Sequence, residues 1–254
     1  MINPLDDATN NSSEPQAVRE RYALRPPTDR YSLLKPDVWQ TVQERQRAML
    51  RLLAHVAPQD WSQLTLLEVG CGSGGNLLEL LRMGFDAGKL AGIELLEERH
   101  AKARHALPAA LQLTLGDAAE AAVAPASLDI VLQSTVFSSL LDRAFQQHLA
   151  DAMWRWVKPG GGVLWYDFTV NNPRNPDVRG VPLARVRALF PQGRVQSQRV
   201  TLAPPIARTV TRIHPGLYPV FNAVPLLRTH LLAWVAKASY SGCESRAARD
   251  GTGC

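Results

Sequence analysis

The sequence has few cysteines and no long apolar run. Its three cysteines, Cys71, Cys243 and Cys254, stand far apart in 254 residues. They form no C-x-x-C pair and no zinc-ligand spacing, so we predict no disulfide framework, no bound metal and a reducing, cytoplasmic location. No stretch approaches the ~18 consecutive apolar residues of a spanning helix, so no integral membrane segment is predicted.

Charge and composition exclude further classes of protein. The 28 basic and 23 acidic residues leave a net charge of +5, spread along the chain. Without a basic stripe interleaved with aromatic residues, this excess does not predict nucleic-acid binding. The N-terminal residues MINPLDDATNNSSEPQAV lack the apolar segment of a signal peptide. Apolar residues make up 46% of the chain, which suits a globular protein with a substantial core.

Strand and helix patterns alternate along the chain. Short apolar runs predict strands over 64–69, 90–94, 111–115, 128–133, 162–167, 195–202 and 230–236. Helices are predicted over 37–57, 76–82, 96–106, 143–157 and 182–189. This alternation predicts an α/β fold: a doubly wound, mostly parallel, seven-stranded sheet with helices on both faces. A closing antiparallel strand is compatible with the pattern.

Composition predicts one domain between two tails. The polar residues 1–17 and 239–254 are expected to be a disordered and a flexible tail. The single domain, 18–238, is divided into an N-terminal lid with helices (18–57), a ligand-binding core (58–170), and a substrate loop with the last strands (171–238). Oligomeric state is not predictable from the sequence.

Four glycines follow the first predicted strand, in the segment LEVGCGSGGN over 67–76. Glycines let a ligand approach the backbone, and the strand–loop–helix order presents N–H groups at the carboxyl edge of a parallel sheet. Gly70, Gly72 and Gly75 satisfy G-x-G-x-x-G, and Glu94 ends the next strand. Dinucleotide sites share both signals, so a nicotinamide- or flavin-dependent oxidoreductase is one hypothesis.

Three features favour a cationic ligand with a single nucleoside. Glu68 precedes the glycines, where a carboxylate would repel a pyrophosphate but attract an ammonium or sulfonium group. Asp117 follows the third strand after Gly116, where it can accept from an adenine amino group. The segment Val157–Gly162, VKPGGG, predicts a tight turn into the fifth strand.

Together these motifs resemble class I S-adenosylmethionine-dependent methyltransferases. The matching strings are EVGCGSGG from Glu68, IE at Ile93, GD at Gly116, DIVL at Asp129 and VKPGG at Val157, in the family's order. The resemblance covers about residues 37–170. It implies a Rossmann-like methyltransferase fold, S-adenosylmethionine as cofactor, and methyl transfer by in-line displacement.

The resemblance also implies roles for individual residues. Glu68 and the backbone of Gly70, Gly72 and Gly74 would surround the methionine part, and Glu94 would bind the ribose hydroxyls. Asp117 would hold the adenine. The remaining residues implied in cofactor binding are Cys71, Asn76, Leu95, Ala118, Gln133 and Ser134.

Structural interpretations of the same residues stay open. Glu68 could cap the loop, Glu94 could be a solvated carboxylate at a strand end, and Asp117 could form an Asx turn. Gln133 and Ser134 replace the aromatic or acidic residue usual near that strand end, which leaves their role undecided. Cys71 suits packing better than nucleophilic attack, because no base is near it in sequence.

Acceptor specificity is expected outside the shared motifs. Tyr22 and Tyr31, interleaved with arginines, could form a lid over the cofactor or simply anchor a solvated basic segment. Donors and acceptors in the loop after the fifth strand suit a sugar or phosphate, or they satisfy the loop's own backbone. They are Asn171, Asn172, Arg174 and Arg179. Asp167 is the candidate general base, needed only for a weakly acidic hydroxyl.

The strings NNPRNPDVRG and LLRTHLLAWVAK resemble methyltransferases encoded with bacterial cell-surface glycan pathways. This favours a polysaccharide-biosynthesis enzyme that methylates a hydroxyl of a small molecule or glycan precursor. A non-catalytic partner subunit of the same fold is a further alternative. The apolar stretch 217–236 is expected to be core, or else a surface for a lipid-linked substrate.

Overall fold

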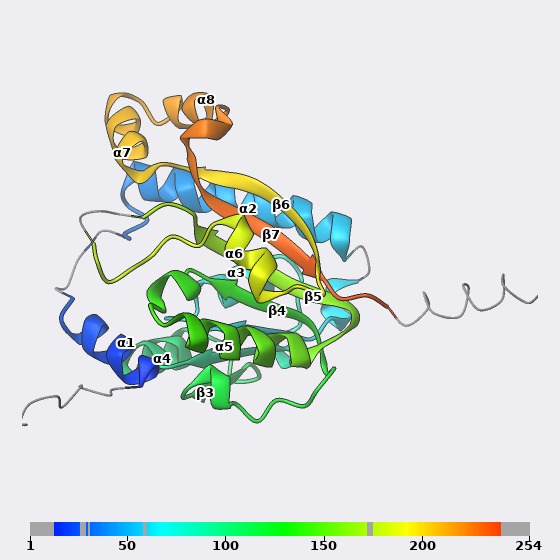
Figure 1. The fold of residues 1–254 in the computed structure, drawn as a ribbon. Helices are drawn as coiled ribbons and strands as arrows, with labels where there is room; N and C mark the ends of the chain where they lie inside the picture. Colours follow the sequence, from blue (N-terminus) through cyan, green and yellow to red (C-terminus); the bar gives the residue numbers. More distant parts are fainter. Residues whose placement is uncertain (1–12, 26–28, 30, 58–59, 172–174, 240–254) are drawn as a thin grey trace, which may run out of the picture.

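The seven predicted strands form one sheet in the order β3-β2-β1-β4-β5-β7-β6 (Figure 1). The computed structural model describes residues 13–25, 29, 31–57, 60–171 and 175–239. Its strands are β1 Leu66–Val69, β2 Leu90–Glu94, β3 Gln112–Leu115, β4 Leu128–Ser134, β5 Val157–Phe168, β6 Arg194–Leu202 and β7 Arg228–Ala236. Its helices are α1 Glu14–Ala23, α2 Pro36–Val56, α3 Gly75–Arg82, α4 Glu97–Ala106, α5 Arg143–Trp156, α6 Leu183–Leu189, α7 Pro204–Ile213 and α8 Leu217–Asn222. The predicted fold class is confirmed.

The sheet is parallel except at one strand. β1 pairs in parallel with β2 and β4, and β4 pairs in parallel with β5. β7 runs antiparallel to both neighbours, with Phe168 of β5 opposite His230. The start of β7 therefore lies at the carboxyl edge of the parallel strands, where functional loops gather.

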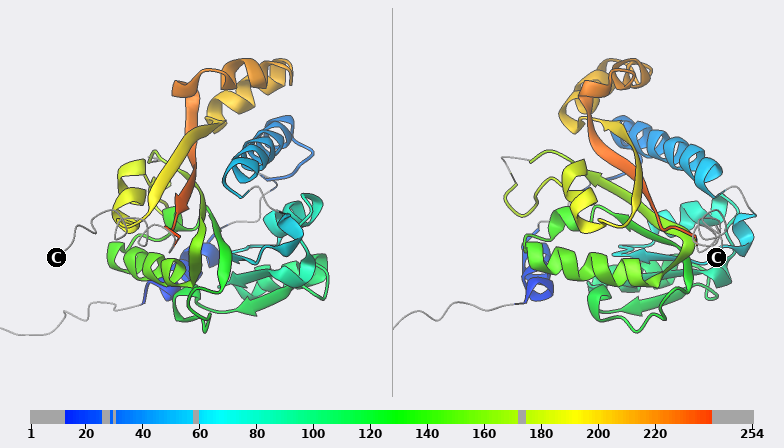
Figure 2. Two further views of the ribbon diagram at one scale, coloured as in Figure 1. Left: turned by 90° about the vertical axis from the view of Figure 1, so that its right-hand side faces the viewer. Right: turned by 45° about the vertical axis from the view of Figure 1, so that its right-hand side comes forward.

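Helices cover both faces of the sheet, as the two views of Figure 2 show. One face packs against α5 and α6 and buries Trp156, Trp165 and Phe137. The other packs against α2, α3 and α4. Leu67 and Val69 of β1 contribute to the first core, whereas Leu66 belongs to the second. Side chains alternate along a strand, so Glu68 projects toward the second face.

The predicted turn residues lie at the start of β5, and their contacts explain the motifs that begin at Asp129 and Val157. Lys158 donates to a carboxylate oxygen of Asp129 across 2.9 Å, and the Thr65 backbone N–H donates to the same oxygen across 2.9 Å. A Cβ at Gly161 would lie 2.4 Å from the Asp129 carbonyl oxygen. These motif residues fasten β4 and β5 together at the edge opposite the glycine loop, so their role is structural.

Three helices differ from the expectations. α1 begins at Glu14, inside the segment 1–17 expected to be a disordered tail, and it buries Pro15 and Val18. α7 and α8 form between β6 and β7, where no helix was predicted. Residues 1–12 and 240–254 of the two expected tails lie outside the described residues. No described helix is long and apolar enough to cross a membrane.

Candidate active site

The glycine loop joins β1 to α3 through three left-handed residues. Gly70, Gly72 and Gly74 have φ values of +64°, +59° and +85°. A Cβ at Gly70 would lie 2.5 Å from Val136, and one at Gly74 would lie 2.7 Å from Leu107. A Cβ at Gly72 would meet nothing within 4 Å. Packing and conformation thus require glycine at two positions, while Gly72 presents bare backbone to open space.

Glu94 at the end of β2 binds the glycine loop. One carboxylate oxygen accepts from the Gly72 N–H at 2.7 Å, and the other accepts from the Leu96 N–H at 2.9 Å. The side chain is buried except for 5% of its surface. A carboxylate oxygen has more than one lone pair, so both oxygens can also accept from a ligand's hydroxyl groups.

Glu68 is a fully buried carboxyl group with one unused oxygen. Its Oε1 accepts from the Asn76 amide at 2.6 Å, whereas Oε2 has no hydrogen-bond partner among the described residues. Burial raises the pKa of Glu68 to about 7, although the Asn76 bond and the nearby Arg45 charge oppose this rise. Burial of an oxygen without a partner destabilises the folded protein, so this atom suits a ligand that brings a hydrogen-bond donor or a positive charge.

A cavity of about 110 Å³ lies between these strand ends and α1. Seven residues predicted for the site line it: Tyr22, Gly70, Glu94, Leu95, Asp117, Ala118 and Ser134. Asp117 also accepts from the Ala119 N–H at 2.9 Å, so it forms the Asx turn and faces the cavity at once. The structure therefore brings together residues from four separate strand ends.

Helix α1 covers this cavity. Pro15, Val18 and Tyr22 contribute to its wall, and the Tyr22 ring lies between the guanidinium groups of Arg25, at 3.7 Å, and Arg99, at 4.6 Å. The cavity is smaller than the ~300–1,000 Å³ usual for ligand pockets.

A bond network fixes α1 to the loop after β4. Glu14 accepts from the Leu141 N–H at 2.7 Å and pairs with Arg21 at 2.8 Å. Arg21 also donates to the Ser139 carbonyl at 2.8 Å. These bonds lie between the start of α1 and the residues that precede α5. They hold α1 against the cavity wall.

Residues 66–161 match the family model described as a methyltransferase domain. This segment contains the glycine loop, Glu94, Asp117 and the end of β4, within the sheet order described above. The chain contains a methyltransferase domain. The oxidoreductase alternative is thereby set aside, since the glycine fingerprint that supported it lies inside the matched domain.

Solved structures share the fold of the methyltransferase at low sequence identity. A SAM-dependent methyltransferase from Archaeoglobus fulgidus is 14% identical, with a TM-score of 0.56 over 77% of this chain and 96% of that chain. The PH0226 protein from Pyrococcus horikoshii is 15% identical, with a TM-score of 0.56 over 86% and 99%. The [4+2]-cyclase SpnF is 15% identical, with a TM-score of 0.57 over 78% and 83%. No curated protein matches the sequence.

The residues present fit S-adenosylmethionine. Glu68 has an unpaired, fully buried carboxylate oxygen, and the backbone of Gly72 has open space beside it, but neither residue lines the described cavity. Glu94, Leu95, Asp117 and Ala118 form one wall of the cavity. Carboxylate acceptors and bare backbone suit a nucleoside of net positive charge that offers hydroxyl and amino donors.

Three predicted residues are sealed inside the methyltransferase. Asp167 is fully buried, and its carboxylate accepts from the N–H groups of Ser138 and Phe168. Burial raises the pKa of Asp167 to about 7 against these hydrogen bonds. It lies outside the described cavity walls, and its hydrogen bond to the Ser138 N–H holds the loop after β4; its role as general base stays a prediction. Gln133 also holds this loop, through the Val136 N–H, and Cys71 packs against Leu77 in the second core.

The residues predicted to bind the methyl-accepting substrate are scattered. Tyr31 is exposed. Asn171 accepts from the Gly180 N–H at 2.9 Å and so closes its own loop, and Arg179 binds the Ser138 carbonyl through its backbone. Asn172 and Arg174 lie outside the described residues. The Asn171 side chain thus bonds its own loop backbone, whereas the Arg179 bond is made by the main chain, so the role of these residues in acceptor binding stays a prediction.

Sequence reasoning missed several residues of the cavity wall. Val18 and Pro15 were placed in or next to a tail, because α1 has no pronounced amphipathic pattern. Arg99 lies on α4, and its contact with Tyr22 depends on tertiary structure. Thr135 lines the cavity with φ +58°, an unfavourable conformation for a β-branched residue. Its position one residue after β4 was the available signal.

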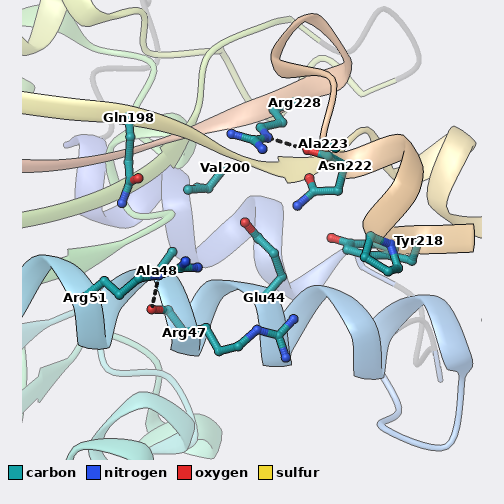
Figure 3. A pocket seen from close by; sticks show the side chains of 11 residues that line it. Glu44, Arg47, Ala48, Arg51, Gln198, Val200, Tyr218, Asn222, Ala223 and Arg228 are labelled. Atoms are coloured by element: carbon teal, nitrogen blue, oxygen red, sulfur yellow. Dashed lines mark hydrogen bonds between the residues drawn. The ribbon is translucent and has the colours of Figure 1, made fainter. Parts of the chain in front are cut away.

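A second cavity, of about 340 Å³, lies between α2, β6, α8 and the start of β7 (Figure 3). Its wall is formed mainly by polar and charged side chains. They include Glu44, Arg47, Arg51, Gln198, Asn222 and Arg228. Glu44 accepts from the N–H of Thr201 at 3.1 Å, and the Thr201 hydroxyl lies 2.9 Å from the hydroxyl of Tyr166. Tyr166 is the register partner of Ser134, which lines the first cavity.

Proposed function

We propose that the methyltransferase transfers a methyl group to a hydroxyl of a small molecule or cell-surface glycan precursor. The supporting observation is the second cavity, whose walls mix donors such as Arg51 with acceptors such as Glu44 and Asn222. Hydroxyl groups both donate and accept, so a polyhydroxylated acceptor matches such a wall. A cytoplasmic location belongs to the same proposal and is supported by the widely spaced cysteines.

In this proposal Glu94 accepts hydrogen bonds from the ribose hydroxyls and Asp117 accepts from the adenine amino group. Glu68 faces the positively charged methionine part together with the open backbone of Gly72. When bound, S-adenosylmethionine supplies an electrophilic methyl group on a sulfonium. The protein's contribution is to hold the acceptor hydroxyl in line and to exclude bulk water, with α1 on the outside. The oxygen–methyl bond would form as the sulfonium–methyl bond breaks, with S-adenosylhomocysteine as the leaving group and the hydroxyl proton released to solvent.

The first experiment compares ligands by thermal shift on the full chain. S-adenosylmethionine and S-adenosylhomocysteine should each raise the melting temperature, because both bind only the folded state. NADH is the control and should leave it unchanged. A shift with NADH alone would overturn the cofactor assignment.

The second experiment tests the acceptor. Methyl-labelled S-adenosylmethionine is incubated with nucleotide sugars, hexose phosphates, phenols and amines, and the products are analysed by mass spectrometry. We expect methyl ethers of the sugar hydroxyls. Methylation confined to amines contradicts the proposed hydroxyl chemistry. Tight cofactor binding without turnover on any substrate supports a non-catalytic partner subunit instead.

A further inference from the structure

The second cavity contains a buried amide oxygen without a partner. Asn222 ends α8 with 8% of its surface exposed, and its Oδ1 has no hydrogen-bond partner among the described residues. Figure 3 shows the Asn222 amide turned toward the space above Glu44. A buried polar atom without a partner is unfavourable in a folded protein unless a ligand or water completes it. Asn222 therefore marks a place for a donor such as a hydroxyl group.

Two arginines give the same cavity unused positive charge. Arg228 donates from Nε to the Asn222 carbonyl at 2.7 Å and from Nη1 to the Arg199 carbonyl at 3.0 Å. These bonds fix the guanidinium and do not use Nη2. Arg51 donates only from Nε, to the Arg47 carbonyl at 3.2 Å. Fixed guanidinium groups bind phosphate and carboxylate with favourable geometry.

The sequence supplies little negative charge to neutralise these arginines. Residues 178–239, which form β6, α7, α8 and β7, contain eight arginines and one lysine but no Asp or Glu. Glu44 is the one carboxylate in the cavity wall, and its Oε2 is already engaged by the Thr201 N–H at 3.1 Å and hydroxyl at 3.4 Å. The wall is therefore net positive yet retains acceptors for hydroxyl groups.

We propose that the cavity between α2, β6 and α8 binds an anionic sugar, a hexose that carries a phosphate or a carboxylate. The anionic group lies between Arg51 and Arg228, and the sugar hydroxyls donate to Asn222 and Glu44. This inference rests on the proposed function, because it identifies the cavity as the acceptor subsite. A cavity of about 340 Å³ falls within the range of small-ligand pockets.

The test is calorimetric titration of the full chain, with and without S-adenosylhomocysteine. The probes are glucose and galactose 1-phosphates, glucuronate and galacturonate, with neutral glucose and inorganic phosphate as controls. We expect at least one anionic sugar to bind at least tenfold more tightly than either control. Tighter binding of the phosphates or of the uronates identifies which anionic group is preferred. No binding of any anionic sugar at about 10 mM overturns the proposal.

Variants assign the binding to this cavity. Asn222→Ala and Arg51→Gln should each weaken anionic-sugar binding at least tenfold, while exposed Arg155→Gln on α5 serves as the matched control. Unchanged binding in both cavity variants overturns the location. S-adenosylhomocysteine binding is measured in the same samples. If the wild type does not bind S-adenosylhomocysteine, the methyltransferase mechanism is refuted. If the wild type binds S-adenosylhomocysteine but no sugar, only the subsite is refuted.

A different observation concerns the helices beyond this cavity. Figures 1 and 2 show α7 and α8 projecting past the end of the sheet. Large apolar side chains are exposed there within 14 residues: Ile213, Val220, Phe221, Val224 and Leu226. Arg208 and Arg212 are exposed on α7, and no ion pair described for the chain involves them.

We propose that this tip, residues 208–226, binds the surface of an anionic phospholipid bilayer. Exposed apolar side chains combined with unpaired arginines favour insertion at the headgroup region of anionic membranes. A second copy of the chain suits the tip less well, because it would bring the unpaired Arg208 and Arg212 of both copies together. A bilayer of phosphatidylglycerol complements both the apolar and the charged features.

The test is sedimentation of the full chain with vesicles of phosphatidylcholine alone or with 30% phosphatidylglycerol, a composition that supplies a surface charge. We expect binding to the anionic vesicles only, weakened by salt. Leu226, 85% exposed, has a matched control in Leu24, 84% exposed beside α1. Leu226→Asp should reduce binding at least tenfold and Leu24→Asp should leave it unchanged.

Equal binding of both variants, or no binding of the wild type, overturns the membrane proposal. Sedimentation velocity tests the alternative that a second copy of the chain covers the tip. A dimer of the wild type that Leu226→Asp dissociates would show that the tip is a contact between copies.

Discussion

Replacing Glu94 by glutamine changes a single atom at the centre of the proposed cofactor site. Both carboxylate oxygens of Glu94 accept backbone N–H groups, from Gly72 at 2.7 Å and from Leu96 at 2.9 Å. Glutamine has one acceptor oxygen, so its NH₂ group must face one of these two donors. With 5% of Glu94 exposed, that donor loses its partner in a place water hardly reaches. We expect the free energy of unfolding to fall by about 1–3 kcal/mol.

The effect on cofactor binding should be larger. In the proposed complex, two ribose hydroxyls donate to a charged acceptor, and each such bond contributes about 1.5–3 kcal/mol. Glutamine keeps a weaker, neutral acceptor on one side only. A loss of about 3 kcal/mol corresponds to a roughly 100-fold rise in the Kd for S-adenosylhomocysteine. Isothermal titration calorimetry measures this directly.

The control for Glu94→Gln lies three residues away. Glu97→Gln makes the same chemical change at an exposed position in the first turn of α4 and should alter neither Kd nor stability appreciably. A folded Glu94→Gln protein that binds S-adenosylhomocysteine within threefold of the wild type would refute the ribose role.

Three further predictions concern the same region. Burial raises the pKa of Glu68 from 4.5 to about 7, so the folded state holds a proton that the unfolded state releases between these values, and stability falls as pH rises through this window. The melting temperature of Glu68→Gln minus that of the wild type should therefore increase from pH 5 to pH 8, and the variant should bind cofactor more weakly. A difference that does not change with pH contradicts the titration of Glu68. Gly74→Ala places a Cβ 2.7 Å from Leu107 at φ +85°, so the free energy of unfolding in urea should fall by at least ~2 kcal/mol. Gly75→Ala is the control, because its Cβ meets nothing within 4 Å, and its stability should not change. Equal effects would show that the contact with Leu107 is relieved. Glu14→Gln weakens the attachment of α1 and should speed protease cleavage near its end severalfold, with Glu20→Gln on the same helix as control; identical cleavage of both variants would show that Glu14 does not hold the helix.

Local patterns were sufficient for the central sheet. β1, β2 and β4 are short apolar runs that end at glycine or polar residues, and each is buried on both faces in the structure. Such runs leave little choice but a parallel core, so the strand predictions agree with the structure to within a few residues. β5 is the exception, since it starts at Val157 instead of Gly162. Its turn residues are drawn into the sheet by the contact between Lys158 and Asp129.

Local patterns failed where packing against distant segments decides the structure. α1 is polar and short, and it forms where Glu14 reaches the Leu141 N–H, 127 positions away. α7 and α8 are interrupted by Pro and Gly, and they are held by Tyr218 and Val210 in a small core of their own. Isolated helices of such length are marginal in water, so tertiary contacts determine whether they exist.

The sequence by itself determined that the glycine loop, Glu68, Glu94 and Asp117 occur at strand ends, which any parallel sheet brings to one edge, and the resemblance of these motifs to class I methyltransferases indicated the cofactor. The tertiary structure decided which side chains are accessible there. Asp167 was a candidate base in the sequence, but its carboxylate is enclosed by the Ser138 and Phe168 N–H groups. The polar cavity around Asn222 joins α2 to segments more than 140 residues later. Burial and contact across such separations depend on the folded arrangement, which spacing along the chain does not specify.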